Sequence, residues 1–447
     1  MALTLEEVAL LEEHHKLFDA QLSSDTKLRR YFQGSQVIEQ LGMAVPPAYR
    51  KFLTIINWCG VQVKTLEARS DLRGMILPGQ STVDPRLQQI IDANNLDADL
   101  SMFMTDRYVY GRSFFSVGSN EENKDLPLIH VESPRQMTVR VDARLRRLKS
   151  AVKFYGVDAN RAGPTDATLM LPDSTVWVQK NPSTGRWVDV SRDEHKLGRV
   201  PIVMSLCDRE SGTWSGRSVM TDLMGITDDA ARALTNLLFA SEATAIPQKW
   251  AVGLSDDDFT GPDGKPVPKW LTYYNAIWAS GDASVKFGQF TASDLKNFDT
   301  QLTLYGKMAA SATGLPSRYF GLTTTNPPSA DAIRAEEAQM VTYIQRQNAQ
   351  VGTVLGWTAA LALRFADGAW LDGTRIGVEW QDPATPTIAQ REDALSKRRA
   401  AGVLSREGYW DELGWSEARK AKEREYLAAE GDTDPELALA RSLTSGV

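Results

Sequence analysis

The longest stretch of regular hydrophobic spacing in the chain covers residues 329–367 and predicts one long helix. Ser329 is placed to cap its first amides, Asp331 suits the positive end of the helix dipole, and Gly368 marks its end. At about 1.5 Å per residue the helix would be roughly 57 Å long, whereas globular helices usually have about 8–20 residues. The recurring apolar positions are Ile333, Met340, Ile344, Val351, Leu355, Thr358, Ala362 and Phe365.

Two shorter helices, starting near Ser218 and Ser293, carry apolar residues at alternating spacings of three and four. This spacing is typical of helices that pack along nearly parallel neighbours. An ordinary helical hairpin in a core explains either helix alone equally well. The two faces consist of Leu223, Ile226, Ala230, Ala233, Leu237 and Ala240 and of Leu295, Phe298, Leu302, Tyr305, Ala309 and Ala312.

Between Tyr108 and Cys207 the hydrophobic period changes to two, which predicts short strands. The motif NPSTGRW is expected to form a hairpin turn within this region. A block of strands inserted among helices predicts an α+β fold. The expected strands cover residues 108–117, 126–133, 137–141, 148–157, 167–172, 174–180, 186–192 and 201–207.

The remaining parts of the chain are expected to be mostly helical. Residues 4–32 form one or two amphipathic helices with Leu5, Val8, Leu11 and Leu17 on one face. The charged residues 388–432 are also helical. Further elements are helices over residues 47–58, 85–95 and 97–109 and strands over residues 61–68 and 373–383.

A small β-rich unit of about 48 residues, 244–291, separates the two shorter helices. It concentrates aromatic residues, which so short a unit cannot bury alone. We therefore expect it to bury them against another copy of itself. The aromatic residues are Trp250, Trp270, Tyr273, Tyr274 and Trp278.

The length and composition of the chain limit the classes of protein to which it can belong. The 447 residues allow two to four domains, and 24% charged residues with 42% hydrophobic residues are ordinary for a soluble chain. No apolar run is long enough for a membrane span, and the N-terminus has no signal-peptide pattern. Two cysteines argue against a disulfide framework and indicate a reducing cytosol. The net charge of −7 does not favour a nucleic-acid binder.

No catalytic or metal-binding pattern occurs in the sequence. Phosphate-loop and dinucleotide-binding motifs are absent, as are zinc-type pairs of histidine or cysteine. The scattered histidines are expected to be packing or surface residues. The acidic triplet Asp256–Asp258 is better explained as a solvated loop tip than as a cation site. We therefore expect no enzyme activity, no cofactor and no metal.

Four local sequences resemble the portal proteins of tailed bacteriophages, in the branch typified by Bacillus siphophages and common in actinobacterial phages. The weakest of the four is NWCGVQVKTL, which keeps only the shape of the family's motif. VPIVMSLCDRESGTWSGRSVM, with the helix after it and its exit AIPQK, resembles the strand and first stem helix of that family. SDLKNFDTQLTLYGKMAASATGLPSRYFG resembles the second stem helix and its Gly-Leu-Pro turn. TTTNPPSADAIRAEEAQMV resembles the loop that leads into the long helix. The resemblance covers most of residues 45–440, and residues 196–345 are the specific part.

The resemblance implies a portal fold with wing, helical stem, β-rich clip and helical crown. The wing would be residues 33–215, with its β-rich part at 108–207, preceded by an N-terminal helical segment at 1–32. The long helix and its return to the wing would be residues 330–384. The stem, clip, tunnel loop and crown would be residues 216–243 with 293–314, 244–292, 315–329 and 385–447, respectively.

The resemblance also implies a ring, usually of twelve subunits, at one vertex of the virion capsid, assembled in the host cytoplasm. Double-stranded DNA would pass through it during packaging and ejection. Its expected partners are the terminase large subunit, a head–tail adaptor, the major capsid protein and a scaffolding protein, with no membrane. The ATPase of this system belongs to the terminase, so the portal itself is not enzymatic.

Three groups of residues are candidates for function. An uncharged tunnel loop suits brief contact with moving DNA, because Lys or Arg contacts with phosphates would retain it. The aromatic residues of the clip suit contacts between subunits. A basic patch suits the capsid or packaged DNA, although a solvated basic face explains it equally well. The loop residues are Leu322, Thr323, Thr324, Thr325 and Asn326, and the patch is Arg135, Arg140, Arg144, Arg146, Arg147, Lys149 and Lys153.

Two alternatives stay open from the sequence. The chain could be a non-portal factor that binds nucleic acid through its β-rich region, or a capsid-associated structural protein outside the portal family. Of the three, the portal interpretation alone requires a closed ring.

Overall fold

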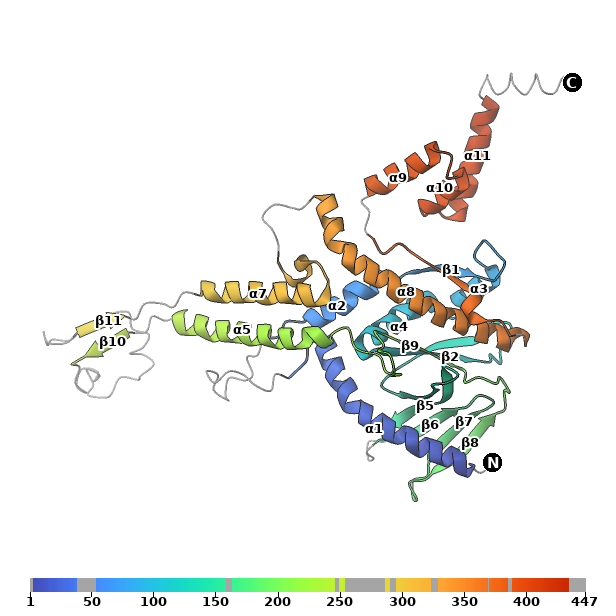
Figure 1. Ribbon diagram of the computed structural model, residues 1–447, viewed down its shortest axis with the longest axis horizontal. Coiled ribbons are helices and arrows are strands. Elements are labelled where there is room, and N and C mark those ends of the chain that lie inside the picture. Colours follow the sequence, from blue (N-terminus) through green and yellow to red (C-terminus); the bar gives the residue numbers. More distant parts are fainter. Residues whose placement is uncertain are drawn as a thin grey trace, which may run out of the picture. The chain divides into compact units, whose positions relative to one another are not determined.

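The structure, a computed structural model, contains both helices and antiparallel sheets, as an α+β fold requires (Figure 1). It forms two compact units, residues 1–328 with 335–383 and residues 329–334 with 384–447. Among the described residues no helix combines the length and the apolarity that a membrane span needs. The structure describes residues 3–37, 54–157, 163–245, 249–253, 286–289, 295–322, 329–368, 370–384 and 388–433.

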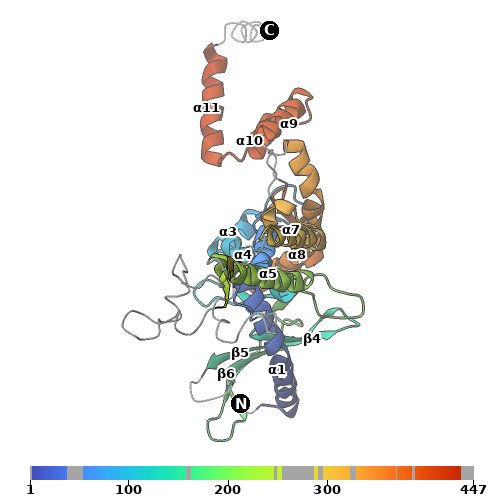
Figure 2. The ribbon, with the colours of Figure 1, turned by 90° about the vertical axis from the view of Figure 1, so that its left-hand side faces the viewer.

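Helix α1 (Leu5–Gln33) lies across a five-stranded antiparallel sheet in the first unit (Figure 2). A reciprocal capping box starts the helix, in which the Thr4 hydroxyl accepts from the Glu7 amide and the Glu7 carboxylate accepts from the Thr4 amide. Leu11 is fully buried in the core that this helix shares with the sheet. The strands, in spatial order, are β4 (Met137–Asp142), β5 (Arg147–Val157), β6 (Pro164–Met170), β7 (Thr175–Lys180) and β8 (Trp187–Asp193).

The predicted apolar face of α1 is partly wrong. Leu5 is 92% exposed, whereas Glu7 and His14 are buried on the side that faces the sheet. Arg192 of β8 forms an ion pair with Glu7, and two hydroxyl groups of the sheet bond to His14. Polar residues can occupy this buried face because each finds a partner there.

A second antiparallel sheet has the order β3 (Leu128–Glu132), β2 (Arg112–Gly118), β9 (Ile202–Leu206). Together with β4–β8 it accounts for every strand predicted between residues 108 and 207, although residues 108–110 of the first predicted strand belong to α4 instead. The NPSTGRW turn also forms as predicted, because Asn181 and Arg186 pair through their backbones at the β7–β8 hairpin. Helices α3 (Pro85–Ala93) and α4 (Leu96–Tyr110) precede this sheet, also as predicted.

The strand expected over residues 61–68 is wrong, because these residues lie in helix α2 (Trp58–Glu67) and the capping turn that follows it. Asn57 caps the helix by accepting from the Gly60 amide. Cys59, Val63 and Leu66 are buried at helical spacing, so tertiary burial outweighs the alternating pattern. The nearby strand β1 (Leu72–Ile76), which the sequence did not indicate, pairs with β12 (Gly377–Trp380).

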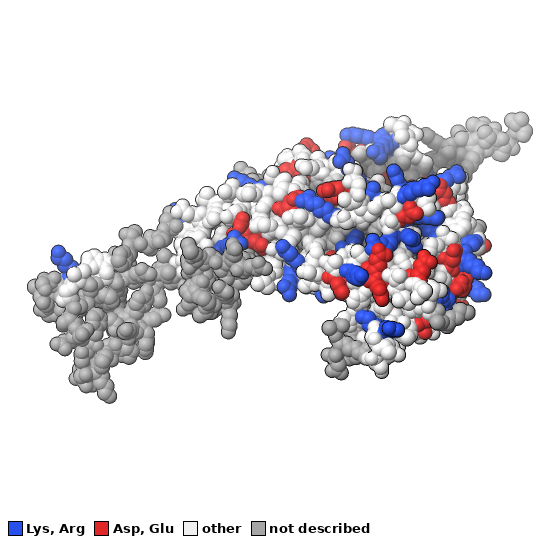
Figure 3. All heavy atoms as spheres, turned by 60° about the horizontal axis from the view of Figure 1, so that its bottom comes forward, with Lys and Arg blue, Asp and Glu red and all other residues white. Residues whose placement is uncertain are grey.

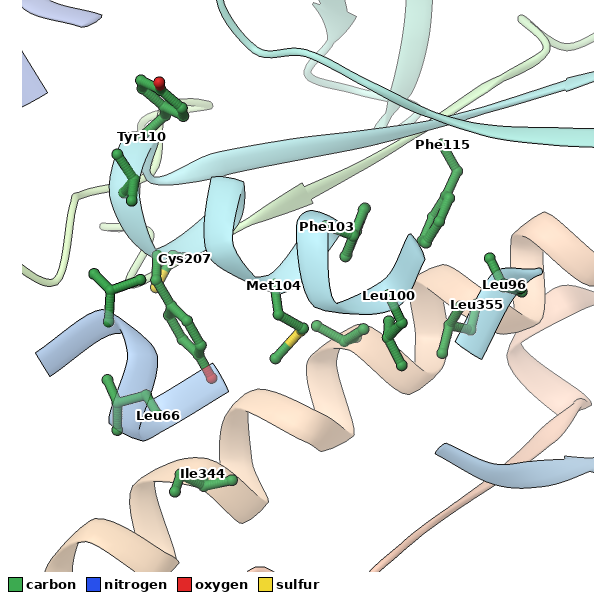
Figure 4. Close-up of a cluster of buried hydrophobic side chains, with 14 of the residues drawn as sticks. Leu66, Leu96, Leu100, Phe103, Met104, Tyr110, Phe115, Cys207, Ile344 and Leu355 are labelled. Carbon is green, nitrogen blue, oxygen red and sulfur yellow. The ribbon is translucent and has the colours of Figure 1, made fainter. Parts of the chain in front are cut away.

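The long helix α8 (Ala330–Asp367) runs through the core of the first unit, where α4 lies between it and β2 (Figure 4). Leu100 and Met104 of α4 point toward α8, and Phe103 turns the other way to stack on Phe115 of β2 with ring centroids 4.0 Å apart. Ser329 caps the helix and Gly368 ends it with φ +72°, both as predicted. Of the predicted apolar positions, Met340, Ile344, Val351, Leu355, Thr358 and Ala362 are buried.

The second unit contains helices α9 (Ile388–Ala400), α10 (Arg406–Glu412) and α11 (Glu417–Thr433). Trp410 and Trp415 stack with centroids 5.7 Å apart. Arg424 of α11 forms a bidentate ion pair with Glu407 of α10 at 2.7 and 2.8 Å. The charged sequence of this region is therefore helical, as predicted.

Candidate functional site

Helices α5 (Thr221–Ala245) and α7 (Lys296–Thr313) pack side by side (Figure 1). Their predicted apolar faces meet, and alanines at the contact allow the backbones to approach closely. Ala312, predicted on this face, is exposed. The fully or almost fully buried members are Leu223, Ala230, Ala233 and Ala309.

Another face of α7 carries two large apolar side chains that are about half exposed. Leu304 and Met308 are 55% and 45% exposed. Their spacing of four residues makes them neighbours on one side of the helix. Two adjacent apolar side chains on the outside of an already packed helix pair offer a face that another chain can cover.

Helix α7 ends at Gly314, whose φ of +68° is the left-handed conformation that favours glycine. Pro316 then precedes a short helix η3 (Ser317–Phe320). Phe320 is buried and meets Trp58 edge to face, with ring centroids 5.7 Å apart. This contact fixes the chain just after α7 to helix α2.

Leu322 continues this anchoring on the other side. It lies against Gly306 of α7, where an added Cβ would come within 3.2 Å of the Leu322 side chain. Among the five residues predicted to line the channel, Leu322 therefore packs on α7. The other four, Thr323–Asn326, lie outside the described residues.

A charged cluster ties η3 to α8 at the same place. Glu337 of α8 is 4% exposed and lies between Arg69, which follows α2, and Arg318 of η3. Arg69 donates to Glu337 at 3.1 Å, to the Tyr319 hydroxyl at 3.1 Å and to a backbone carbonyl. Burial alone would lower the pKa of Arg69, but its bonds to Glu337 and Tyr319 raise it above the ordinary value. Three segments that are distant in sequence are thus joined through one carboxylate.

A second polar network holds the middle of α8. Arg107 is completely buried and donates to the Ser205 hydroxyl and the Gln350 side chain, both at 2.8 Å. Asp208, just after β9, accepts from Tyr343 at 2.8 Å and from Gln347 at 2.9 Å. These bonds make α8 a fixed support for the segment that precedes it.

The predicted clip residues are described only in part. Strands β10 (Lys249–Val252) and β11 (Lys286–Gln289) pair antiparallel, and the Trp250 ring lies over Gly288. Trp250 is 38% exposed. Trp270, Tyr273, Tyr274 and Trp278 lie outside the described residues.

The seven residues of the basic patch fall into three groups in the structure. Arg140 pairs with Glu13 of α1, and Lys153 pairs with Glu132 at 2.7 Å. Arg135 is half-buried. The other four cationic residues are exposed at the β4–β5 hairpin and form no ion pair with any described residue. They are Arg144, Arg146, Arg147 and Lys149.

The turn of the β4–β5 hairpin, which carries these four residues, is held by side-chain to backbone hydrogen bonds. Asp142 accepts from the backbone amides of Arg144 and Leu145, both at 2.9 Å. Elsewhere, on the face seen in Figure 3, basic and acidic side chains are interspersed. Residues 144–149 thus carry four cations and no acidic residue, on a chain of net charge −7.

No metal-binding cluster of histidine, cysteine and carboxylate groups occurs in the part of the chain that the structure describes. His14 is a packing residue, with its ring nitrogens 2.8 Å from the Thr138 and Ser150 hydroxyls. Burial, together with the charge of Arg140, lowers its pKa to about 4. Both cysteines are buried, and burial raises the pKa of Cys59 to about 12.

The sequence comparisons decide the family. Residues 18–436 match the model of the family described as "Phage portal protein, SPP1 Gp6-like". The chain belongs to this portal family. It is 31% identical to the portal protein of Mycobacterium phage D29, over 89% of this chain and 83% of that protein. It is also 31% identical to the portal protein of Mycobacterium phage L5, over 91% and 84% of the two chains.

Solved structures that match this chain have lower sequence identity than the two mycobacteriophage proteins. Chains from the neck of an empty gene transfer agent particle and from the neck of a native one match with TM-scores of 0.46 and 0.45 and identities of 14% and 15%. Each match covers 88% of this chain and 93% of the other. The assignment to the portal family is carried by the sequence matches.

Membership of the portal family confirms the resemblance and excludes the two alternatives left open by the sequence. The portal family is structural and not enzymatic. Sequence reasoning located the segment between α7 and α8 but missed the Arg69–Glu337–Arg318 cluster that supports it. Arg69 and Glu337 are 268 residues apart, and no local pattern connects them.

Proposed function

We propose that copies of this portal protein form a ring, expected to contain twelve subunits, with a central channel through which double-stranded DNA is packaged and ejected. One observation carries this proposal, namely the half-exposed apolar pair Leu304 and Met308 on the packed α5–α7 pair. A heterologous contact that covers this face on every copy generates a ring when the rotation closes. The expected position of the ring is one vertex of the virion capsid, reached after assembly in the host cytoplasm.

The domain map follows from the same proposal. The stem comprises residues 216–243 and 293–314, which contain most of α5 and all of α7. The crown, residues 385–447, coincides closely with the main segment of the second compact unit. The wing comprises residues 33–215 and the return at 330–384. Because α1 packs on the wing sheet, we assign residues 1–32 to the wing as well.

We assign the segment at 315–329 to the narrow part of the channel and residues 244–292 to a clip between subunits. The fixed contacts of Phe320, Leu322 and Glu337 support the first assignment, because they hold the base of the uncharged residues 322–326. Uncharged residues can touch phosphates without the salt-dependent retention that Lys or Arg would add. The exposed Trp250 supports the second.

We further propose that the exposed tip of the β4–β5 hairpin contacts packaged DNA. Its four cationic side chains lack carboxylate partners among the described residues, so they are available to phosphates. The expected protein partners are the terminase large subunit, a head–tail adaptor, the major capsid protein and a scaffolding protein. No hydrolase activity is expected from the chain itself.

Native mass spectrometry and negative-stain imaging of the purified protein test the ring. The wild-type chain should form closed rings with a central hole, and Leu304→Asp should weaken them while leaving subunit unfolding unchanged. Met102→Asp makes the same apolar-to-acid change at a residue that is 54% exposed in α4, away from this face of α7, and is the matched control. A wild-type protein that stays monomeric, with no ring in phage heads, contradicts the proposal.

A further inference from the structure

A cleft of about 720 Å³ lies between the C-terminal half of α1 and the start of α5. Tyr31 bridges its two walls by donating to Asp228 at 2.5 Å. The cleft is distinct from the tunnel segment, the clip and the basic hairpin described above. The residues that line the cleft are mainly polar, so their hydrogen-bonding groups indicate what kind of ligand the cleft can bind.

Three of the lining residues have buried polar atoms without a hydrogen-bond partner among the described residues. Gln36 is only 3% exposed, and both its amide nitrogen and its amide oxygen are unpaired. One carboxylate oxygen of Asp228 and the Nε of Arg232 are also unpaired. Leaving such groups buried and unpaired costs stability, because each loses its bonds to water without a replacement. Two donors and two acceptors are therefore available to an occupant.

Another side-chain amide in this chain shows what such a group can bind. Asn94 donates to the Pro127 carbonyl at 2.9 Å and accepts from the Ile129 amide at 2.8 Å. It thus pairs with the edge of an extended main chain, which offers a carbonyl and an amide side by side. Gln36 presents the same two groups, both unpaired, to the cleft.

The charges around the cleft favour an acidic occupant. Lys27, Arg30 and Arg232 give three cationic side chains against two acidic ones, a balance of +1, whereas the whole chain has a net charge of −7. Burial raises the pKa of Asp228, whereas the bond from Tyr31 and the charge of Arg232 oppose this rise. A second copy of this chain is on average complementary to such a surface.

We propose that the cleft receives an extended acidic segment of a neighbouring copy of this chain. Gln36 pairs with the main chain of that segment, and Lys27, Arg30 and Arg232 face its carboxylates. The inference rests on the ring proposed above, in which α5 belongs to the stem and a neighbouring copy lies alongside it. It adds a specific contact between the wing of one subunit and the next.

Photo-crosslinking in the assembled protein tests this contact. Val37, at the rim of the cleft, is 67% exposed, whereas the two native cysteines are fully buried. Val37→Cys therefore accepts a benzophenone maleimide selectively. Irradiation should give covalent dimers on denaturing gels, with mass spectrometry placing the attachment in an acidic segment of the second copy. Val190→Cys, 65% exposed on strand β8, is the matched control and should give few dimers.

A second variant tests the role of the amide. Gln36→Met keeps the length of the side chain but cannot pair with a main chain, so the dimer yield from Val37→Cys should fall about tenfold. The unfolding free energy of the subunit should not decrease, because the substitution removes buried unpaired groups. A decrease in stability without a change in crosslinking would show that Gln36 only supports its own subunit.

The outcomes separate this inference from the ring itself. Native mass spectrometry of the same sample reports whether rings form. If rings form but the label attaches only within its own chain, attaches to a different protein or attaches to nothing, the docking inference is wrong and the ring stands. If no rings form, both proposals fail.

Discussion

Arg69 Nη2 lies 3.1 Å from Glu337 Oε1, and the carboxylate of Glu337 also pairs with Arg318. The side chains of Arg69 and Glu337 are only 16% and 5% exposed, so solvent screens this pair weakly. The contact joins the end of α2 to α8 beside the segment proposed to line the channel. It is therefore a place where stability and function can be tested together.

Glu337→Gln should destabilise the first unit by roughly 3 kcal/mol, because it leaves Arg69 without its buried counter-charge. The glutamine keeps the shape of the side chain, so packing is little changed. Denaturant unfolding followed by tryptophan fluorescence measures the effect.

Glu336→Gln is the matched control for this change. Glu336 also pairs with Arg318, at 3.3 Å, but its side chain is 47% exposed. An exposed pair of this kind contributes at most about 1 kcal/mol. Equal effects of the two substitutions would show that the Glu337 cluster is not the main support of this region.

His14 should make the docking of α1 dependent on pH. Its pKa is lowered to about 4 in the folded protein, against about 6.5 in an unfolded chain. The unfolded state therefore binds an extra proton as pH falls below 6.5, so stability is complete above that pH and decreases until about pH 4. The full difference is on the order of 3 kcal/mol.

The measurement is the free energy of unfolding of wild type and His14→Asn between pH 7 and pH 4. Carboxylates titrate in the same range, so the difference between the two curves isolates His14. As the pH falls, the unfolding free energy of the wild type should decrease more steeply than that of His14→Asn. The difference in slope should correspond to the uptake of up to one proton. Parallel curves would contradict the assignment of His14 as a buried neutral residue.

Much of this fold follows from local sequence patterns. The strands between residues 108 and 207, the α5–α7 pair and α8 with its cap all have periodic apolar residues and clear end signals. Predictions from local patterns were wrong or missing where contacts between residues distant in sequence determine the secondary structure. Residues 61–67 alternate like a strand, yet burial against the core makes them helical, and β1 forms because β12 lies beside it.

The candidate site shows the same division. The end of α7 at Gly314 was predictable, because Gly314 and Pro316 are themselves the signal, whereas the channel role of residues 322–326 stays a prediction. The Glu337 cluster and the cleft around Gln36 were not predictable, because their members come together only through the fold. The basic patch was predicted as one group, but the fold pairs Arg140 and Lys153 with carboxylates that the local sequence does not reveal.

The effect of Gly306→Ala on the free energy of unfolding should depend on the side chain at residue 322. An alanine favours a helix by about 1 kcal/mol over glycine, but its Cβ would come within 3.2 Å of Leu322 and displace it. Gly306→Ala should therefore not stabilise the protein when Leu322 is present, but it should stabilise the Leu322→Ala variant. Gly225→Ala in α5 has open space and should stabilise by about 1 kcal/mol in either background. Additive effects of the Gly306 and Leu322 changes would contradict the contact.

Replacing Arg144, Arg146, Arg147 and Lys149 with Ser should reduce the salt dependence of DNA binding by the ring. Each phosphate contact contributes a slope of about −0.9 in log K against log salt. Arg140→Ser with Lys153→Ser is the control, because both residues already have carboxylate partners. An unchanged slope combined with loss of incorporation into capsids would assign the hairpin to a protein contact instead.

Thr324→Lys should make packaging and ejection more sensitive to salt. If the segment at 315–329 lines the channel, the substitution adds one positive charge per subunit at its narrow part. A lysine there would hold phosphates of passing DNA, and the retention would weaken as salt displaces it. Val403→Lys, at a position 79% exposed in the second unit, adds the same charge at a residue assigned to the crown.

The readouts for Thr324→Lys are the amount of DNA packaged and the rate of ejection across a salt series, in particles that assemble normally. At low salt the variant should slow ejection, and high salt should restore the wild-type rate because counterions screen the added charge. Val403→Lys should follow wild type throughout. If both variants behave like wild type, or if both show the same salt response, the charge at residue 324 does not meet the DNA, and the assignment of this segment to the channel is wrong.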